Sequence, residues 1–242
     1  LNLNITTGKK FHSNQLDEEI ILKNKTHLIC EKSRKKVVEK AIKNNFDVVI
    51  FDDGLQDRNI NYDLKIVCFD SENWIVNGYL IPSGPLREKI DSIKKYDIVF
   101  LKGECLNEKK IIKLIKNQNP EIKVFQSYYE AVNLDRFNIK NDYLIFSGIV
   151  NPNNFRNFLI KNNFKVIDEI IFPDHYEYKQ EDINKIKLKA KKLNAKIITT
   201  EKDYVKLSAK DADNIDFIEI DLKIKNETDL INLINPIVNE KY

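Results

Sequence analysis

The sequence contains no methionine, few glycines and only three cysteines. Cys30, Cys68 and Cys105 lie far apart and form no Cys-x-x-Cys pair, so neither a disulfide framework nor a zinc site is indicated. We therefore expect a reducing, cytosolic setting. No apolar run approaches the roughly 20 residues needed to span a bilayer, and no signal peptide is visible. The sequence thus offers no candidate transmembrane segment.

The sequence also lacks a strong excess of charge of either sign, with 40 lysines and arginines against 37 aspartates and glutamates. Short lysine runs such as Lys9-Lys10 and Lys191-Lys192 are interleaved with acidic residues, which is typical of solvated helix faces rather than of a nucleic-acid patch. We therefore expect no nucleic-acid partner. A mildly basic surface still suits loose contact with an anionic membrane.

Short apolar runs alternate with longer amphipathic stretches along the chain. Several runs are rich in β-branched and aromatic residues, as expected of strands buried on both faces. The alternation predicts a parallel α/β sheet with helices on both faces. Strands are expected at 47–51, 64–69, 97–101, 122–125, 143–146, 165–172, 196–199 and 217–220, and helices at 33–44, 107–116, 153–161, 180–193 and 227–234.

The segment from Ser127 to Asn141 is polar and lacks helical periodicity, so it is the best candidate for a linker between domains. On this prediction, residues 1–126 form a first α/β domain, residues 127–141 form the linker, and residues 142–242 form a smaller C-terminal α/β domain.

The sharpest local signal is an apolar strand that ends in Asp52 and Asp53 and is followed by Gly54. Ligands of open α/β sheets bind beyond the carboxyl ends of the strands. Carboxylates at that position are placed to hold Mg²⁺ against nucleotide phosphates, as a Walker B aspartate does. The alternative is that one of the aspartates merely caps the following turn.

The loop that leads to Arg87 and Glu88 contains two glycines and two prolines, which indicates a rigid turn. The Arg87 guanidinium offers a fixed fork for a phosphate or a carboxylate, although an exposed ion pair beside a structural turn is the alternative.

His175 stands beside Asp174 after a predicted strand. A histidine at a strand end is placed to accept a proton from a sugar hydroxyl, although a structural histidine is the alternative. Asp17, Glu18 and Glu19 fit the acidic first turn of a helix.

Together these patterns resemble the tetraacyldisaccharide 4'-kinase family of lipid A synthesis over about residues 11–207. The acidic pair Asp17-Glu18 also matches that family, and so does Arg34, which stands at the start of a predicted helix. The matching stretches are Asp17-Glu18, Arg34, Asp52-Asp-Gly-Leu-Gln56, Gly78-Tyr-Leu-Ile-Pro-Ser-Gly-Pro-Leu-Arg-Glu88, Ser147-Gly-Ile-Val-Asn-Pro152, Phe172-Pro-Asp-His175 and Thr200-Glu-Lys-Asp-Tyr-Val-Lys206.

The resemblance implies ATP-dependent, Mg²⁺-requiring phosphorylation of the 4'-hydroxyl of a tetraacyl disaccharide 1-phosphate. It further implies peripheral contact with the cytoplasmic face of the bacterial inner membrane. The site residues that it implies are Asp17 and His175 for catalysis, Asp52 and Asp53 for the metal and the nucleotide, Arg87 for the nucleotide, and Glu18, Arg34, Gln56 and Glu88 for the substrate. Of these, we expect Asp52, Asp53, Arg87, Glu88 and His175 to converge on one cleft.

The sequence departs from the family pattern at several positions. Asp57 replaces a histidine, Leu16 and Glu19 replace a glycine and a proline beside the acidic pair, and Tyr176 replaces a second histidine. None of the six glycines has the spacing of a phosphate-binding loop, Gly-x-x-x-x-Gly-Lys-[Ser/Thr]. The resemblance places that loop before the start of this chain.

With no methionine and no such loop, we expect a sequence truncated at its N-terminus. Its sheet would be of the P-loop-kinase type without the first βα unit, and the chain would be weak or inactive alone. Two other functional classes stay open at this point. One is a Mg²⁺-dependent phosphohydrolase with Asp52 as nucleophile, although such enzymes typically carry Asp-x-Asp-Gly. The other is a non-catalytic module that binds a nucleotide or a lipid.

Overall fold

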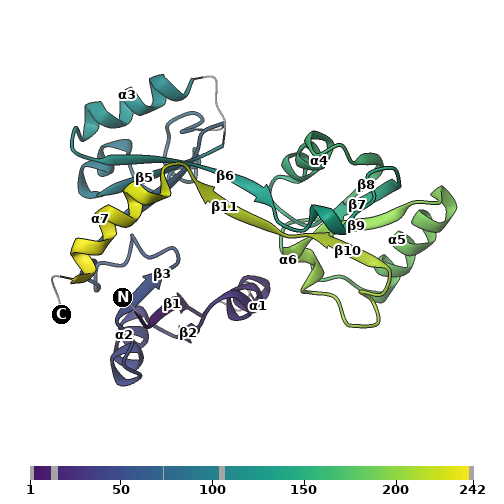
Figure 1. The fold of residues 1–242 in the computed structure, drawn as a ribbon, viewed down its shortest axis with the longest axis horizontal. Helices are drawn as coiled ribbons and strands as arrows, with labels where there is room; N and C mark the ends of the chain where they lie inside the picture. Colours follow the sequence, from purple (N-terminus) through teal and green to yellow (C-terminus); the bar gives the residue numbers. More distant parts are fainter. Residues whose placement is uncertain (1–2, 12–15, 73, 104–106, 240–242) are drawn as a thin grey trace. The chain divides into compact units, whose positions relative to one another are not determined.

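The computed structural model describes residues 3–11, 16–72, 74–103 and 107–239 (Figure 1). The chain divides into two compact units. Unit 1 comprises residues 1–52 and 131–220, and unit 2 comprises residues 53–130 and 221–242. No helix of the described ranges combines the length and the hydrophobicity of a membrane span.

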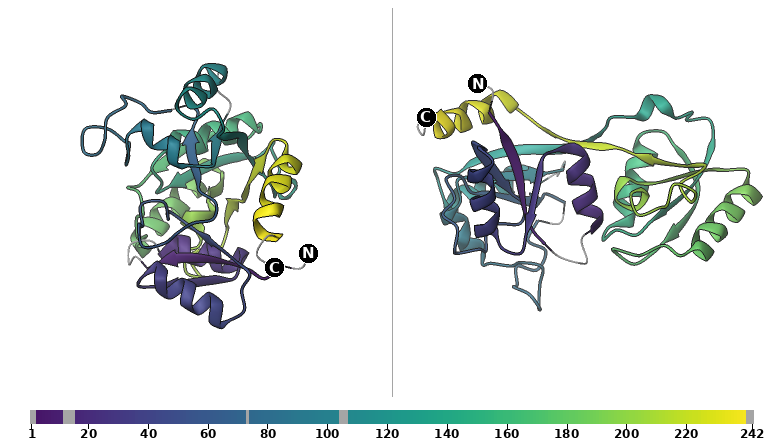
Figure 2. Two further views of the ribbon diagram at one scale, coloured as in Figure 1. Left: turned by 90° about the vertical axis from the view of Figure 1, so that its left-hand side faces the viewer. Right: turned by 90° about the horizontal axis from the view of Figure 1, so that it is seen from below.

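The N-terminal part of unit 1 is a parallel sheet with strand order β2-β1-β3. Helix α2 covers one face of this sheet (Figure 2), and its Val37 and Ala41 are fully buried. A Cβ on Gly8 would lie 2.8 Å from side-chain atoms of Val37 and Phe51, so the glycine permits close packing. The elements are β1 (Ile5–Lys10), α1 (Leu16–Lys25), β2 (Leu28–Glu31), α2 (Arg34–Lys43) and β3 (Val48–Phe51).

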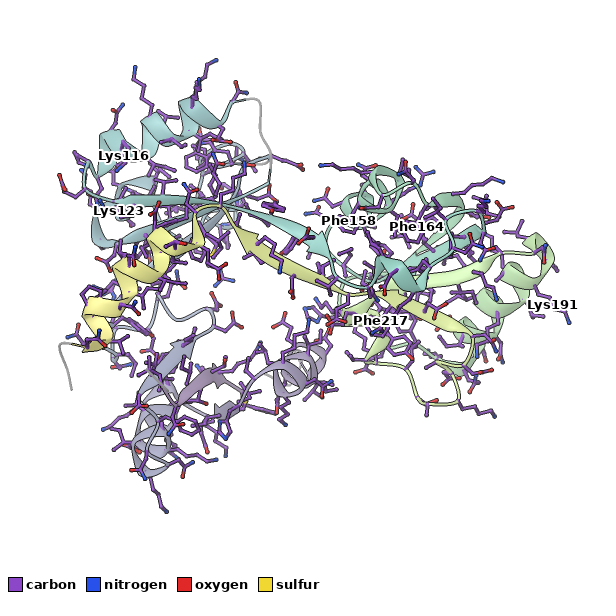
Figure 3. The ribbon with its side chains drawn as sticks, viewed as in Figure 1. Lys116, Lys123, Phe158, Phe164, Lys191 and Phe217 are labelled. Carbon is purple, nitrogen blue, oxygen red and sulfur yellow. The ribbon has the colours of Figure 1, made fainter. Side chains whose placement is uncertain are left out.

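The rest of unit 1 is a second parallel sheet with order β10-β9-β7-β8. The central strand β7 is buried on both faces: Tyr143 and Ile145 pack under α4, and Leu144 and Phe146 pack under α5. Lys191 on α5 projects outward (Figure 3). The elements are η3 (Leu134–Arg136), β7 (Asp142–Ser147), α4 (Pro152–Lys161), β8 (Lys165–Ile171), α5 (Gln180–Leu193), β9 (Lys196–Thr200), α6 (Glu201–Tyr204) and β10 (Ile215–Ile218).

Unit 2 contains a sheet with order β11-β6-β5-β4, of which β4, β5 and β6 are parallel. Helix α3 packs on one face of β5 through Ile111 and Ile115. Helix α7 packs on the other face, where Leu230 joins Ile98 and Phe125 (Figure 1). The elements are β4 (Ile66–Asp70), η2 (Ile90–Lys95), β5 (Ile98–Lys102), α3 (Glu108–Gln118), β6 (Lys123–Ala131), β11 (Ile220–Ile224) and α7 (Glu227–Asn239).

The expected parallel α/β architecture is confirmed, but the compact units do not follow the predicted division at 127–141. Strand β6 continues to Ala131. Asn133 then donates to the Phe217 carbonyl at 2.9 Å and accepts from the Glu219 amide at 3.0 Å. Residues 221–242 return to unit 2 instead of completing a C-terminal domain. These pairings join residues more than 80 positions apart, which local periodicity does not reveal.

Candidate active site

The predicted pair Asp17 and His175 is brought together inside unit 1. Asp17 lies in the first turn of α1, with 4% of its side chain exposed. Its Oδ2 atom is 3.1 Å from Nδ1 of His175, although 158 residues separate the two in the sequence. A buried carboxylate against one nitrogen of an imidazole orients the ring and leaves the other nitrogen for proton transfer.

The turn after β8 holds His175 in a left-handed backbone conformation, with φ of 56°. Histidine is one of the residue types that tolerate this region better than most. The His175 amide donates to the Asp174 carboxylate at 3.0 Å and to the Gly148 carbonyl at 3.3 Å. The loops after β7 and β8 therefore hold the backbone of His175 together.

Two lysines that received no role from the sequence surround this pair. Lys206 Nζ lies 3.5 Å from the Asp17 carboxylate. Lys202 Nζ lies 3.2 Å from His175 Nε2, 3.2 Å from Asp174 Oδ1 and 4.0 Å from the Asp17 carboxylate. A spacing of four residues puts both lysines on one side of a helical turn, a signal present in the sequence.

Behind Lys206, a fully buried Asp203 connects the loops of unit 1. Its carboxylate accepts hydrogen bonds from the Gly148 amide at 2.9 Å, the Thr200 hydroxyl at 2.7 Å and Lys206 at 3.0 Å. Burial and the charge of Asp203 raise the pKa of the Tyr178 hydroxyl, which therefore stays protonated. The network fixes the position of the Lys206 ammonium.

A second cluster forms at the carboxyl ends of β1 and β3. Lys9, whose side chain is 5% exposed, lies 2.5 Å from the Glu18 carboxylate and 3.2 Å from the Asp52 carboxylate. Burial opposes its charge, but the hydrogen bond to Glu18 and the charges of both carboxylates outweigh burial and raise the pKa of Lys9. Arg34 donates to the backbone carbonyl of Asp52 at 3.3 Å. Two predicted carboxylates thus meet at a lysine that the sequence did not single out, and a third predicted residue, Arg34, contacts the backbone of one of them.

The remaining predicted residues lie in unit 2. The Arg87 guanidinium pairs with the Asp53 carboxylate, and both side chains are more than half exposed. Glu88 accepts a hydrogen bond from the Tyr96 hydroxyl at 3.0 Å. Burial, together with this bond, raises the pKa of Tyr96 to about 12. Gln56 is exposed. That Asp52, Asp53, Arg87, Glu88 and His175 converge on one cleft stays a prediction.

The donor set at the end of β3 fits Mg²⁺. Carboxylate oxygens are the ligands that Mg²⁺ prefers, and one or two of them with substrate phosphates usually suffice. The part of the chain that the structure describes holds no cluster of three or more side chains able to cage a metal. Asp52 and Asp53 each offer carboxylate oxygens of this kind.

Comparison with known proteins decides the family. The family model described as tetraacyldisaccharide-1-P 4'-kinase matches residues 5–239. Over 227 residues the chain is 43% identical to the tetraacyldisaccharide 4'-kinase of Pelagibacter ubique (strain HTCC1062). The aligned region covers 93% of this chain and 71% of that protein. The chain belongs to the tetraacyldisaccharide 4'-kinase family.

Other family members agree with this assignment. The tetraacyldisaccharide 4'-kinase of Rickettsia bellii (strain OSU 85-389) is 35% identical over 213 residues, which are 87% of this chain and 64% of that protein. The chain therefore spans about two thirds of the length of these relatives.

The fold is shared with the crystal structure of the "apo" form LpxK from Aquifex aeolicus in complex with ATP. The TM-score is 0.71 and the sequence identity is 21%, and the alignment covers 98% of this chain and 80% of that chain. At this identity the likeness shows the fold alone. The predicted family, its kinase class and the fold type are confirmed, and the phosphohydrolase alternative is not favoured.

Proposed function

We propose that this chain carries the proton-accepting and metal-binding parts of an ATP-dependent 4'-kinase that acts on a tetraacyl disaccharide 1-phosphate in lipid A biosynthesis. The observation that carries the proposal is the contact between buried Asp17 and His175, two matched motif positions brought together from distant parts of the chain. The acyl chains of such a substrate hold it in a bilayer, which supports peripheral contact with a membrane surface. The cytoplasmic face of the inner membrane is proposed from the family resemblance.

In this reaction, Nε2 of His175 accepts the proton of the sugar hydroxyl while the hydroxyl oxygen attacks the γ-phosphorus of ATP. The bond from that phosphorus to the bridging oxygen breaks, and ADP leaves. Asp17 holds the imidazole through Nδ1 and stabilises the positive charge that the ring acquires. Positioning and charge neutralisation supply most of the rate, as in other phosphoryl transfers.

Asp52 and Asp53 would hold Mg²⁺, which when bound neutralises charge on the phosphates. Arg87 offers its planar fork to the nucleotide phosphates. The matched positions Glu18, Arg34, Gln56 and Glu88 are assigned to the polar part of the substrate. Each of these four is a proposal drawn from its motif position.

The test uses this chain preceded by the phosphate-binding loop segment of a family member. His175→Ala should lower kcat by roughly 10²–10⁴-fold, the range for a lost general base, and leave the KM for Mg·ATP nearly unchanged. Adding Asp17→Ala should lower kcat little further, because residues that act as one unit are not additive.

His27→Asn is the matched control, since the His27 ring bonds Thr6 and contacts no carboxylate in the described structure. It should leave kcat unchanged. Fully additive losses for Asp17 and His175, or an undiminished kcat in His175→Ala, would refute the assignment of the base.

A further inference from the structure

Lys9 lies between two of the carboxylates that the site residues contribute. Its Nζ is 2.5 Å from Glu18 Oε2 and 3.2 Å from Asp52 Oδ2, and 5% of its side chain is exposed. A lysine is almost never buried to this extent unless its charge is paired. The two carboxylates therefore account for the buried ammonium.

The backbone fixes this arrangement. Strands β1 and β3 pair so that Gly8 stands opposite Phe51, and the Asp52 amide donates to the Gly8 carbonyl at 3.3 Å. Lys9 and Asp52 therefore follow these residues at the same edge of the sheet. Glu18 comes from the first turn of α1. The Lys9 ammonium thus joins the end of β3 to the start of α1.

The Asp52 carboxylate is shared between the protein and the solvent. Half of its side chain is exposed, while its Oδ2 atom accepts the hydrogen bond from Lys9. Of the described side chains, Lys9 is the one that contacts this carboxylate. An ammonium and a divalent cation compete for the same carboxylate oxygens, and at a separation of a few ångströms their charges repel each other.

We propose that Lys9 is a built-in cation of the phosphoryl-transfer site, which takes the place of a divalent ion between Glu18 and Asp52 and weakens the affinity of Asp52 for Mg²⁺. The inference deepens the proposed function and rests on its assignment of Asp52 to the metal. Many phosphoryl-transfer sites use two metal ions, about 3.5–4 Å apart. Here the chain itself supplies one of the two positive charges, as the ammonium of Lys9.

A lysine that only positioned Asp52 would have the opposite effect on the metal. If the ion pair merely held the carboxylate in place, its loss would disorder a metal ligand and weaken metal binding. If Lys9 competes with the metal, its loss leaves the Glu18 and Asp52 carboxylates uncompensated and strengthens metal binding. The sign of the change in affinity therefore separates the two roles.

The test is a titration of the 242-residue chain with Mn²⁺, followed by the electron paramagnetic resonance signal of the free ion, with Mg²⁺ as competitor. Mn²⁺ prefers the same oxygen ligands as Mg²⁺. Lys9→Met should lower the Kd for Mn²⁺ by about tenfold or more, since the charge of the ligands sets the affinity of such sites. Lys9→Gln should lower it in the same direction and covers the case in which the methionine variant does not fold. Adding Asp52→Asn to either variant should abolish the gain.

Lys40→Met is the matched control, because it removes an ammonium from a carboxylate of the same unit, Glu31 at 3.0 Å, with half of the lysine side chain exposed. It should leave the Kd for Mn²⁺ unchanged. A Kd that stays or rises in both Lys9 variants, or a gain that survives Asp52→Asn, would overturn the proposal.

Kinase assays separate this inference from the proposed function. They use the chimera in which the phosphate-binding loop segment of a family member precedes this chain. A chimera without 4'-kinase activity, with the tighter Mn²⁺ binding of Lys9→Met still measured in the 242-residue chain, refutes the proposed function and leaves the effect of Lys9 on the metal intact. An active chimera, with no fall in the Kd for Mn²⁺ in the Lys9 variants, refutes the inference alone.

Discussion

The buried pair of Asp203 and Lys206 provides the sharpest test of the unit 1 structure. Asp203 is fully buried, and 12% of the Lys206 side chain is exposed. Removing one partner of a buried ion pair typically destabilises a protein by about 3–5 kcal/mol, because the other charge is left uncompensated. In Asp203→Asn the Lys206 ammonium still has the Asp17 carboxylate as a partner at 3.5 Å. We therefore expect a loss of stability of about 3 kcal/mol, at the lower end of that range.

Lys206→Met should destabilise unit 1 by about 2–3 kcal/mol, because Asp203 keeps the Gly148 amide and the Thr200 hydroxyl as donors. The double variant should be clearly less destabilised than the sum, with a coupling free energy of about 2 kcal/mol. Hydrogen exchange of the β7 and α6 amides and urea unfolding followed by circular dichroism measure the change. The single tryptophan, Trp74, lies in unit 2, so its fluorescence reports on the other unit.

Lys189→Met is the matched control, because its ion pair with Asp168 is on the surface, with 40% of the lysine side chain exposed. A loss of at most about 1 kcal/mol is expected there. Additive losses for the two buried residues, or losses no larger than in the control, would refute the described arrangement of α6 and the Gly148 loop.

Two further changes test other parts of the chain. The stability of unit 2 should fall as the pH rises from about 10 toward about 12, because unfolded Tyr96 ionises first while the folded side chain keeps its proton. Tyr96→Phe should lose this part of the pH dependence of the urea midpoint, and identical slopes for both proteins would contradict the raised pKa. Gly148→Ala should destabilise unit 1 by about 1–3 kcal/mol through overpacking, since its Cβ would lie 2.9 Å from the Pro173 carbonyl. It should also shift the NMR signals of the His175 ring, and an unchanged spectrum would show that the turn does not depend on the glycine.

Local sequence patterns determined the alternating elements. The run at Tyr143–Phe146 predicted β7 because a strand buried on both faces needs apolar side chains at every position. The periodicity of 180–193 predicted α5, whose buried residues recur at Ile183, Ile186 and Ala190. The short motifs predicted the family, because unusual strings such as Pro-Ser-Gly-Pro-Leu-Arg-Glu depend only on residue order.

Strand β1 was not predicted from the sequence pattern. The sequence Ile-Thr-Thr-Gly-Lys-Lys offers little hydrophobic pattern, and its strand character depends on hydrogen bonds to β2 and β3 on either side. The role of Lys9 followed from that strand, since the lysine meets Glu18 and Asp52 only once β1 lies between its neighbours. The two-unit division likewise depends on pairing between β6 and β11, which lie far apart in the sequence.

The sequence by itself determined which residue types stand at the candidate site, namely a histidine, five carboxylates, two arginines and a glutamine. Only the tertiary structure decided which of them meet. The contact of Asp17 with His175, and the two lysines around it, depend on the packing of α1 against α6 and on the turn after β8. Such contacts are set by side-chain direction and long-range packing, neither of which local spacing encodes.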